Sequence, residues 1–254
     1  MTNLIYEQPL NEKIRSYLRL EYLAQQLQAN VEQDHQHRCF EPLFALCELT
    51  ERCDYRGEVL KDVDRQLFAL SKWQSLPSID DQQIELYISR LSAARDILQI
   101  AQRPGQELKQ NRFLTALRQR FNMPGACCNF DLPQLHYWLA KPWHERQEEY
   151  QDWVSQFASL LTPINLLLEL TRQTTIYQQQ TANGGFFQGT SDQALSLIRV
   201  KLSSEQGCYP TISGHRIDTP SILLASINKN IQISLSNSSW QPVANPLKSY
   251  IWFL

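Results

Sequence analysis

This 254-residue chain lacks the short motifs that mark most enzymes. It contains no phosphate-binding P-loop, no Gly-x-Ser-x-Gly nucleophile elbow and no dinucleotide-binding fingerprint. The early cysteines Cys39, Cys47 and Cys53 are spaced by eight and six residues, whereas structural zinc sites use closely paired cysteines. We therefore expect no catalytic residue, no metal site and no cofactor.

Signals for export and for membrane insertion are missing as well. The opening residues, MTNLIYEQPLNEK, form neither a basic segment nor an apolar segment of a signal peptide, which favours the cytoplasm. The apolar run at 160–170 is interrupted by polar residues and is far shorter than the roughly 20 residues that a membrane helix needs. We therefore expect no membrane helix.

The six cysteines do not indicate a disulfide framework, because a cytosolic compartment keeps thiols reduced. A bridge between the adjacent Cys127 and Cys128 would also need a strained ring. Together with His136 this pair could be imagined as a thiol nucleophile and its base, yet no residues supply an oxyanion hole or a third orienting group. We expect both thiols to be structural.

Charge is balanced overall but unevenly distributed. The formal net charge is −2, and only 5 of the 24 basic and 3 of the 26 acidic residues follow Gln178. Hydrophobic residues make up 43% of the chain and charged residues 20%, which is ordinary for a globular protein with a proper core. The last third should therefore be a separate, sparsely charged module.

Apolar residues recur with helical spacing through about Gln178. Segments 59–73 and 84–98 place them on one face, which predicts two amphipathic helices. In segment 11–28 they lie almost all the way round, which predicts a buried central helix with one polar seam that includes Arg19. Pro-containing turns are expected at 76–78, 103–105 and 123–125, and helix starts at Asp131-x-Pro133 and Thr162-Pro163.

After Tyr177 the apolar residues recur at every second position instead of with helical spacing. Residues 196–202 and 231–235 alternate apolar with polar side chains, which predicts antiparallel strands in a small barrel or sandwich. Between the helical and strand regions we expect a connection at 178–189, flexible around Asn183-Gly184-Gly185. The expected fold class is α+β, with a mostly α-helical domain at 1–178 and a small antiparallel β domain at 179–254.

Basic residues gather between Arg103 and Arg120, with Glu107 as the one acid. On a continuous helix Lys109, Arg112 and Arg120 would form a stripe beside an apolar sector. A solvated helix surface would look the same, as charge runs usually do. A second interpretation is a cationic groove for an acidic or mixed-charge peptide, since Arg pairs bidentately with carboxylates.

A third interpretation of this stripe is nucleic-acid binding, with phosphates on the basic residues and bases stacked on Phe113, Phe121, Tyr137 and Trp138. The net charge of −2 and the isoelectric point of about 6.2 disfavour it, because nucleic-acid-binding modules tend to be markedly basic. His136, between aromatic neighbours, would by itself be interpreted as a satisfied core histidine.

Four segments, in this order and spacing, resemble the Z-ring-associated protein D family, ZapD. They are YEQPLNEKIRSYLRLEYL at 6–23, RGEV at 56–59, RQRFNMPGACCNFDLPQLHYWL at 118–139 and YPTISGHR at 209–216. The resemblance extends to about Arg216. The tail after Ser236 does not align with the family, and we expect it to add a strand or to cover an apolar face.

The resemblance implies a non-enzymatic bacterial cell-division protein of the cytoplasm, located at mid-cell. It implies a homodimer that binds the tubulin-like GTPase FtsZ, through the flexible C-terminal peptide of FtsZ, and cross-links its filaments. Basic positions of the family's pocket match Arg19, Arg112 and His136. With the basic stripe and the RGEV and SGHR segments, the expected FtsZ-binding residues are Arg19, Arg56, Lys109, Arg112, Arg120, His136 and Arg216.

Overall fold

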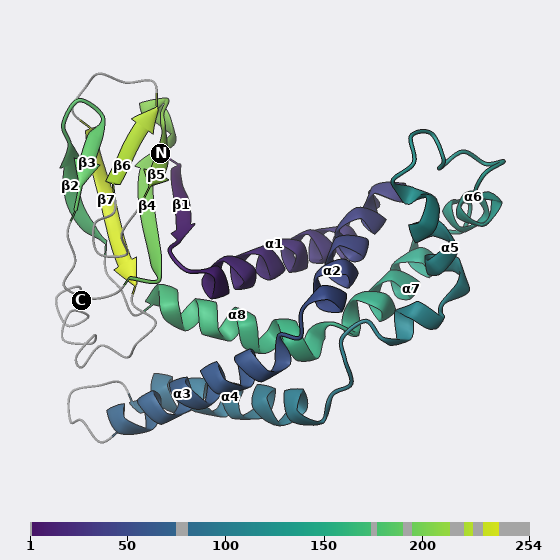
Figure 1. The fold of residues 1–254 in the computed structure, drawn as a ribbon, viewed down its shortest axis with the longest axis horizontal. Helices are drawn as coiled ribbons and strands as arrows, with labels where there is room; N and C mark the ends of the chain where they lie inside the picture. Colours follow the sequence, from purple (N-terminus) through teal and green to yellow (C-terminus); the bar gives the residue numbers. More distant parts are fainter. Residues whose placement is uncertain are drawn as a thin grey trace. The chain divides into compact units, whose positions relative to one another are not determined.

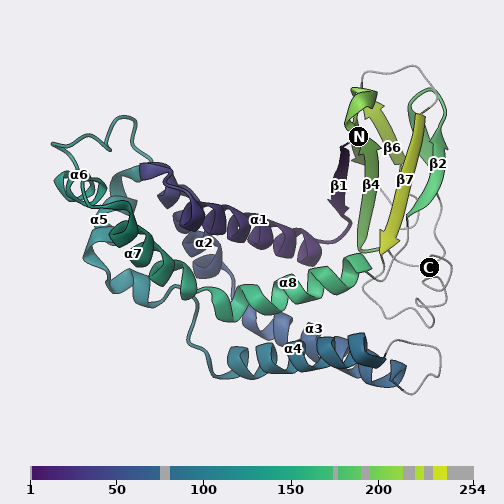
Figure 2. The same ribbon diagram turned by 180° about the vertical axis from the view of Figure 1, so that it is seen from behind.

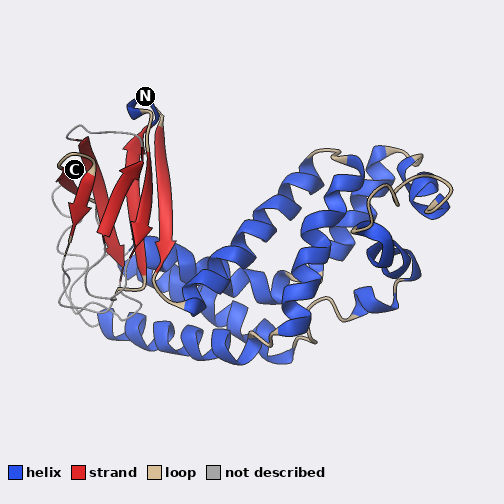
Figure 3. Cartoon of the chain, turned by 45° about the horizontal axis from the view of Figure 1, so that its top comes forward, coloured by secondary structure: helices blue, strands red, loops and turns tan. Residues whose placement is uncertain are grey.

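The computed structural model describes residues 2–74, 81–173, 177–189, 195–213, 221–225 and 231–238. The fold is α+β, as predicted, and Figure 3 shows its helices in blue and its strands in red. Along the chain the α-helices of the described residues precede every described strand except β1. The α-helices of the described residues are α1 (Glu12–Glu32), α2 (Phe40–Arg52), α3 (Arg56–Trp73), α4 (Asp81–Ile100), α5 (Arg112–Phe121), α6 (Pro133–Leu139), α7 (Trp143–Ser155) and α8 (Ala158–Gln173). None of these helices has the length and apolarity needed to cross a membrane.

The strands are β1 (Asn3–Pro9), β2 (Gln178–Ala182), β3 (Phe186–Gln188), β4 (Leu197–Ser203), β5 (Tyr209–Ser213), β6 (Ser221–Ala225) and β7 (Ile231–Ser238). By compactness the chain divides into two units. The sheet unit comprises Met1–Leu18, Ala69–Gln82 and Leu167–Leu254, and the helical unit comprises Arg19–Phe68 and Gln83–Leu166. The domain boundary that we expected after residue 178 stays a prediction.

The sheet unit contains two antiparallel sheets, ordered β1-β4-β7-β2 and β3-β6-β5 (Figures 1 and 2). β4 follows the predicted alternation, because Ile198, Val200 and Leu202 are buried while the residues between them are half-exposed. Phe187 of β3 and Ile212 of β5 pack against this core, so the two sheets share one apolar interior. The sandwich alternative of the prediction therefore describes this unit better than the barrel.

Strand β1 was not predicted. It pairs antiparallel with β4, with Glu7 opposite Arg199 and Ile5 opposite Lys201. The short segment NLIYEQP contains only three strongly apolar or aromatic residues, and its partner strand lies at the other end of the sequence. A local pattern cannot reveal such a long-range pairing, which explains why the sequence analysis missed it.

The expected connection at Asn183-Gly184-Gly185 is a tight turn between two strands, and its flexibility stays a prediction. The chain makes a tight turn there, in which the Phe186 N–H donates to the Asn183 carbonyl at 3.0 Å, and β2 passes directly into β3. Gly184 and Gly185 have φ angles of +58° and +80°, in the left-handed region that glycine enters without steric cost. The turn carries the chain from one sheet to the other.

The predicted amphipathic helices at 59–73 and 84–98 are confirmed as α3 and α4, and the Asp131-x-Pro133 start as α6. The predicted start at Thr162-Pro163 is wrong, because Pro163 lies inside α8. There it is tolerated at the cost of one backbone hydrogen bond, in a helix held by extensive apolar burial. α1 is less buried than predicted, since Tyr22 is 60% exposed.

Aromatic rings join α2, α5, α6 and α7 in the core of the helical unit. Phe40 is central, with ring centroids 5.8 Å from Phe113, 5.1 Å from Trp138 and 6.0 Å from Trp153. Ring pairs at such separations contribute roughly 0.5–1.5 kcal/mol each beyond their area burial. This cluster fixes α5, which carries Arg112 and Arg120, and α6, which carries His136.

Candidate functional site

The basic segment is not one continuous helix. Lys109 lies in a 3₁₀ turn at Glu107–Gln110, and α5 begins only at Arg112. The Asn111 side chain caps α5 by accepting a hydrogen bond from the Leu114 N–H at 3.1 Å. The predicted stripe of Lys109, Arg112 and Arg120 along a single helix is therefore wrong, because the cap separates Lys109 from the other two.

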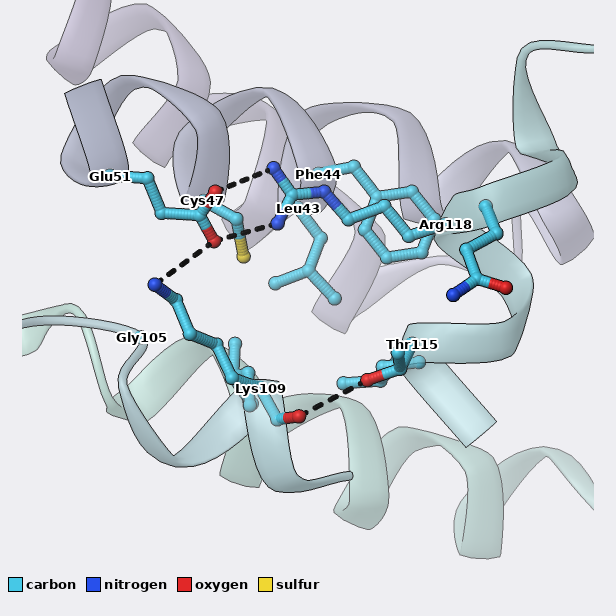
Figure 4. Close-up of a pocket in the computed structure, with 11 residues that line it drawn as sticks. Leu43, Phe44, Cys47, Glu51, Gly105, Lys109, Thr115 and Arg118 are labelled. Carbon is cyan, nitrogen blue, oxygen red and sulfur yellow. Dashed lines mark hydrogen bonds and ion pairs between the residues drawn. The ribbon is translucent and has the colours of Figure 1, made fainter. Parts of the chain in front are cut away.

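Glu51 of α2 gathers two of the basic side chains (Figure 4). The Arg118 guanidinium binds it bidentately, with Nη1 2.7 Å from Oε1 and Nη2 3.0 Å from Oε2. Lys109 Nζ lies 3.7 Å from the same Oε1. The Arg118 hydrogen bonds first, and then the nearby charges of Arg118 and Lys109, hold the pKa of the Glu51 carboxyl below its usual range, although partial burial opposes them.

A cavity of about 320 Å³ opens beside this cluster of Glu51, Arg118 and Lys109. Its walls combine the cluster with mostly apolar side chains, and Thr115 donates to the Lys109 carbonyl at 3.2 Å within it (Figure 4). The other lining residues are Leu43, Phe44, Cys47, Gly105, Leu108, Leu114 and Gln119. The cavity can hold an apolar side chain next to a charged group.

Two lining residues have a structural role. Gly105 has φ of +72°, and a Cβ atom there would lie 2.9 Å from the Phe157 ring, which confirms the predicted turn at 103–105. Burial raises the pKa of Cys47 to about 11, so its thiol stays protonated at neutral pH. The cavity therefore offers no thiolate nucleophile.

Three of the predicted site residues are engaged within the protein itself. Besides Lys109, Arg120 donates to the Asp131 side chain at 3.2 Å. Arg56 donates to the carbonyls of Ala101, at 3.0 Å, and Gln99, where it satisfies the open end of α4. Each of these side chains would have to give up an existing partner to bind FtsZ directly.

Arg19, Arg112 and His136 differ from that group. All three are exposed, and within the described part of the chain none of their side chains makes a hydrogen bond or an ion pair. The core interpretation of His136 is wrong, since its α6 neighbours Leu135 and Trp138 turn inward instead. The convergence of Arg19, Arg112 and His136 into one groove stays a prediction. Arg216 lies outside the described residues.

Three aromatic side chains are also exposed, and the sequence analysis singled out only Tyr137 among them, as a residue for stacking nucleic-acid bases. Tyr22 is 60% exposed one helical turn from Arg19, Tyr137 is 71% exposed next to His136, and Phe130 is 81% exposed. Tyr and Arg are the residues most enriched at the energetic centres of protein interfaces. The spacing of Arg19 and Tyr22 in the sequence already indicates that they lie about one helical turn apart. Only the fold shows that Tyr22 is not in the core.

Cys127 and Cys128 line a second cavity of about 530 Å³, together with His37, Arg38, Glu41, Phe121, Met123 and Gly125. Both thiols are half-buried. Burial, and then the neighbouring Cys128, raise the pKa of Cys127, and Cys128 donates to Asp131 Oδ2 at 3.3 Å. The Cys127 thiol is therefore a weak nucleophile at neutral pH. In the described residues no three His, Cys, Asp or Glu side chains are grouped to hold a metal.

Replacing Glu51 with Gln should lower the free energy of unfolding by about 1 kcal/mol at pH 7. The charged hydrogen bonds to Arg118 are lost, and their value is reduced here because the Glu51 side chain is 31% exposed. The folded pKa of Glu51 is lowered, so its contribution is complete above the unfolded pKa, about 4.3, and is lost as the pH falls through the folded pKa. Urea unfolding at pH 7 and pH 3 measures both effects.

Glu48→Gln is the matched control, because Glu48 pairs with Arg52 on the exposed surface of the same helix. We expect it to change stability by less than about 0.5 kcal/mol. If Glu51→Gln lowered the free energy of unfolding by the same amount at pH 7 and at pH 3, the charge of the Glu51 carboxylate would not be the cause of the loss of stability.

Comparison with known proteins gives one consistent match. The family described as ZapD, cell division protein, matches residues 18–219. The chain is 67% identical to the cell division protein ZapD of Shewanella baltica (strain OS185) over 85% of this chain and 88% of that protein. It is 39% identical to the protein of the same name from Escherichia coli O17:K52:H18, with the same coverage of both chains.

Proposed function

Because this chain belongs to the ZapD family of cell division proteins, we propose that it is a non-enzymatic adaptor for FtsZ. Its site is the surface of Arg19, Arg112 and His136, and its target is the flexible C-terminal peptide of FtsZ. As a homodimer it cross-links FtsZ filaments at mid-cell in the cytoplasm. Membership of the ZapD family supports the role in cell division. The binding surface, the FtsZ peptide as target and the homodimer are our proposal.

The proposal rests on the three exposed cations whose side chains have no partner among the described residues. An Arg that is already paired offers a ligand little net energy, because a new pair replaces an old one. Arg19 and Arg112 keep their full capacity for bidentate pairing with carboxylates. These are also the positions that the family resemblance assigned to the FtsZ pocket. Arg56, Lys109 and Arg120 then support the site from within the fold.

An exposed apolar stripe on α4 supports the homodimer. Leu86 and Ile97 are each 56% exposed and Ile100 is 85% exposed. With Arg90 and Ala93 they repeat at alternating spacings of four and three residues, the spacing of a helix that packs along another helix. The opposite face of α4 buries Ile84, Leu91 and Leu98 in the protein's own core. Within the described part of the chain the stripe is therefore left for a partner.

A second copy is the partner that we propose for this stripe. A twofold axis places the same patch of both copies against each other, so a homodimer needs no other complementary surface. The small Ala93 at the middle of the stripe permits close approach of the two helices. The dimer then presents the FtsZ-binding surface twice, and many dimers along two filaments make each further contact effectively intramolecular.

The nucleic-acid alternative loses support. Of the basic residues between 103 and 120, Lys109, Arg118 and Arg120 pair with acids. Arg103 donates to the carbonyls of Thr50, at 2.9 Å, and Glu51, at 2.8 Å. Only Arg112 of this group is without a partner in the described residues, which is too little charge for a phosphate backbone.

The decisive experiment is co-sedimentation of the purified protein with two forms of polymerised FtsZ, intact and lacking the C-terminal peptide. We expect co-sedimentation and bundling with intact FtsZ and neither with the truncated form. A gel shift with random single-stranded DNA should show no binding. Equal binding to both FtsZ forms would reject the peptide as the target, and binding to DNA alone would reject the adaptor.

A further inference from the structure

The cavity beside Glu51 has a polar mouth and an apolar floor, and it lies wholly within the helical unit. Its lining residues Lys109, Thr115 and Gln119 are exposed, which places them at the mouth. The buried lining residues form the floor and are Leu43, Phe44, Cys47, Gly105, Leu108 and Leu114. Water at such a floor finds few hydrogen-bond partners, whereas an apolar side chain needs none. The cavity therefore favours an apolar group that enters from solvent.

The size of the cavity limits what can enter it. Its volume of about 320 Å³ is at the lower end of the range of roughly 300–1,000 Å³ that ligand pockets span. One large apolar side chain, such as that of leucine, methionine or phenylalanine, suits this volume better than a larger ligand does. We therefore expect the occupant to be a single side chain of a partner chain.

Charge on the cavity walls favours an acidic partner. Among the described residues that line the cavity, Arg118 and Lys109 are positive and only Glu51 is negative, so one positive charge is in excess. Figure 4 shows these three side chains converging on one side of the cavity. The Lys109 Nζ to Glu51 Oε1 distance of 3.7 Å is longer than an ordinary hydrogen bond, so the charge of Lys109 is only partly compensated. An apolar side chain with a carboxylate nearby in its own chain complements such a cavity.

The cavity is continuous along α5 with Arg112 of the proposed FtsZ-binding surface. Arg112, Thr115 and Gln119 follow one another at spacings of three and four residues, which places them on one face of the helix. Thr115 lies about 4.5 Å along the helix axis from Arg112, at about 1.5 Å per residue. Residues of an extended peptide are about 3.3–3.6 Å apart. A peptide whose carboxylate pairs with Arg112 can therefore place a side chain one or a few residues away at the cavity mouth.

We propose that the cavity receives one large apolar side chain of the FtsZ C-terminal peptide, while Arg112 pairs with a carboxylate a few residues away in the same peptide. This anchor rests on the proposed FtsZ function and adds a contact that the three exposed cations cannot supply. Apolar burial is not screened by salt, whereas charge pairs at the surface are. The spacing between the apolar side chain and the carboxylate then selects the peptide, because both must fit α5 at once.

Thr115→Trp tests the cavity, because an indole at the mouth occupies the space of the incoming side chain. Fluorescence anisotropy of a labelled FtsZ C-terminal peptide with the full chain measures the affinity. We expect at least about tenfold weaker binding, since burial of a large apolar side chain contributes at least that factor. Gln119→Trp, also at the mouth, is the second variant if Thr115→Trp fails to fold. Circular dichroism verifies the fold of each variant.

Two controls separate the loss of space from other effects. Gln151→Trp adds the same indole to the exposed surface of α7, away from the lining residues, and should bind the peptide like the wild type. Thr115→Val keeps the shape of the side chain and removes only its hydrogen bond to the Lys109 carbonyl. It should also bind normally, because the proposed role of the mouth is to admit a side chain.

Alanine replacement of each apolar residue of the peptide in turn identifies the anchor. We expect one replacement to weaken binding to the wild type at least about tenfold. The same replacement should have little further effect on Thr115→Trp, because the two changes remove one contact. If every replacement weakened binding to both proteins equally, no side chain of the peptide would enter the cavity.

The outcomes distinguish the anchor from the function on which it rests. Normal peptide binding by Thr115→Trp and Gln119→Trp, with loss of binding in Arg112→Glu, would overturn the anchor and leave the proposed function intact. Failure of the wild type to bind the peptide would overturn both. A change of oligomeric state in Thr115→Trp with unchanged peptide affinity, measured by analytical ultracentrifugation, would assign the cavity to a second copy of the chain instead.

Discussion

Replacing Arg112 with Glu should abolish co-sedimentation with FtsZ and leave the fold and the oligomeric state unchanged. Arg112 is exposed at the first position of α5 and has no partner within the described residues, so its loss breaks no intramolecular contact. Breaking a hydrogen-bonded charge pair at an interface costs about 2–5 kcal/mol, which weakens binding by about 30-fold or more. Co-sedimentation, circular dichroism and analytical ultracentrifugation measure the three properties.

Arg19→Glu is an independent test of the same surface, and Lys61→Glu controls for an unspecific effect of the charge change. Lys61 is also exposed on a helix of the helical unit, and its reversal should leave bundling normal. Bundling by the wild type should weaken as salt rises toward about 0.5 M, because screening then limits attraction to contact distance. If both Arg reversals bundle FtsZ normally, the surface is misassigned and the region of Arg216 becomes the candidate.

Arg118→Glu would be misleading in the same assay. Its guanidinium is bound to Glu51, and reversal would place two carboxylates together beside the cavity. Loss of co-sedimentation in that variant would report a damaged helical unit as readily as a damaged binding site. The distinction between Arg112 and Arg118 depends on a contact between residues 67 positions apart in the sequence.

The different roles of Arg112 and Arg118 show what the sequence analysis could not predict. Periodicity predicted α3, α4 and β4, because each has one face that must be buried in the protein's own core. The basic residues carry no comparable signal. Whether Lys109 or Arg120 is paired or free depends on which acids tertiary folding brings near it, and local spacing contains no information about that. The family resemblance supplied Arg19, Arg112 and His136, and the structure adds that these three are the unpartnered ones in its described part.

α4 illustrates the same limit for apolar residues. The sequence of α4 is apolar on more than one face, and the pattern alone identified only the face of Ile84, Leu91 and Leu98. Which apolar residues remain uncovered follows from the packing of the other helices. β1 is the corresponding case in the sheet unit, since its pairing partner could not be inferred from its own seven residues.

Replacing Ile97 and Ile100 together with Asp should convert the protein into a monomer that binds FtsZ but no longer bundles it. Both side chains are exposed on α4, so the fold does not need them. In a twofold dimer the double variant removes four apolar side chains from the interface. At about 1.5 kcal/mol or more for each, the total is about 6 kcal/mol, which weakens dimerisation by more than about ten-thousandfold.

Gln99→Asp is the matched control, because it adds a carboxylate to the same last turn of α4 but off the stripe. It bears the same unfavourable interaction with the helix C-terminus and should remain a dimer. Analytical ultracentrifugation gives the oligomeric state, fluorescence anisotropy with an FtsZ C-terminal peptide gives single-site binding, and light scattering gives bundling. A dimeric Ile97→Asp, Ile100→Asp variant would exclude α4 as the interface. A monomeric variant that still bundled would mean that each chain has two FtsZ sites, because one site on a monomer cannot bridge two filaments.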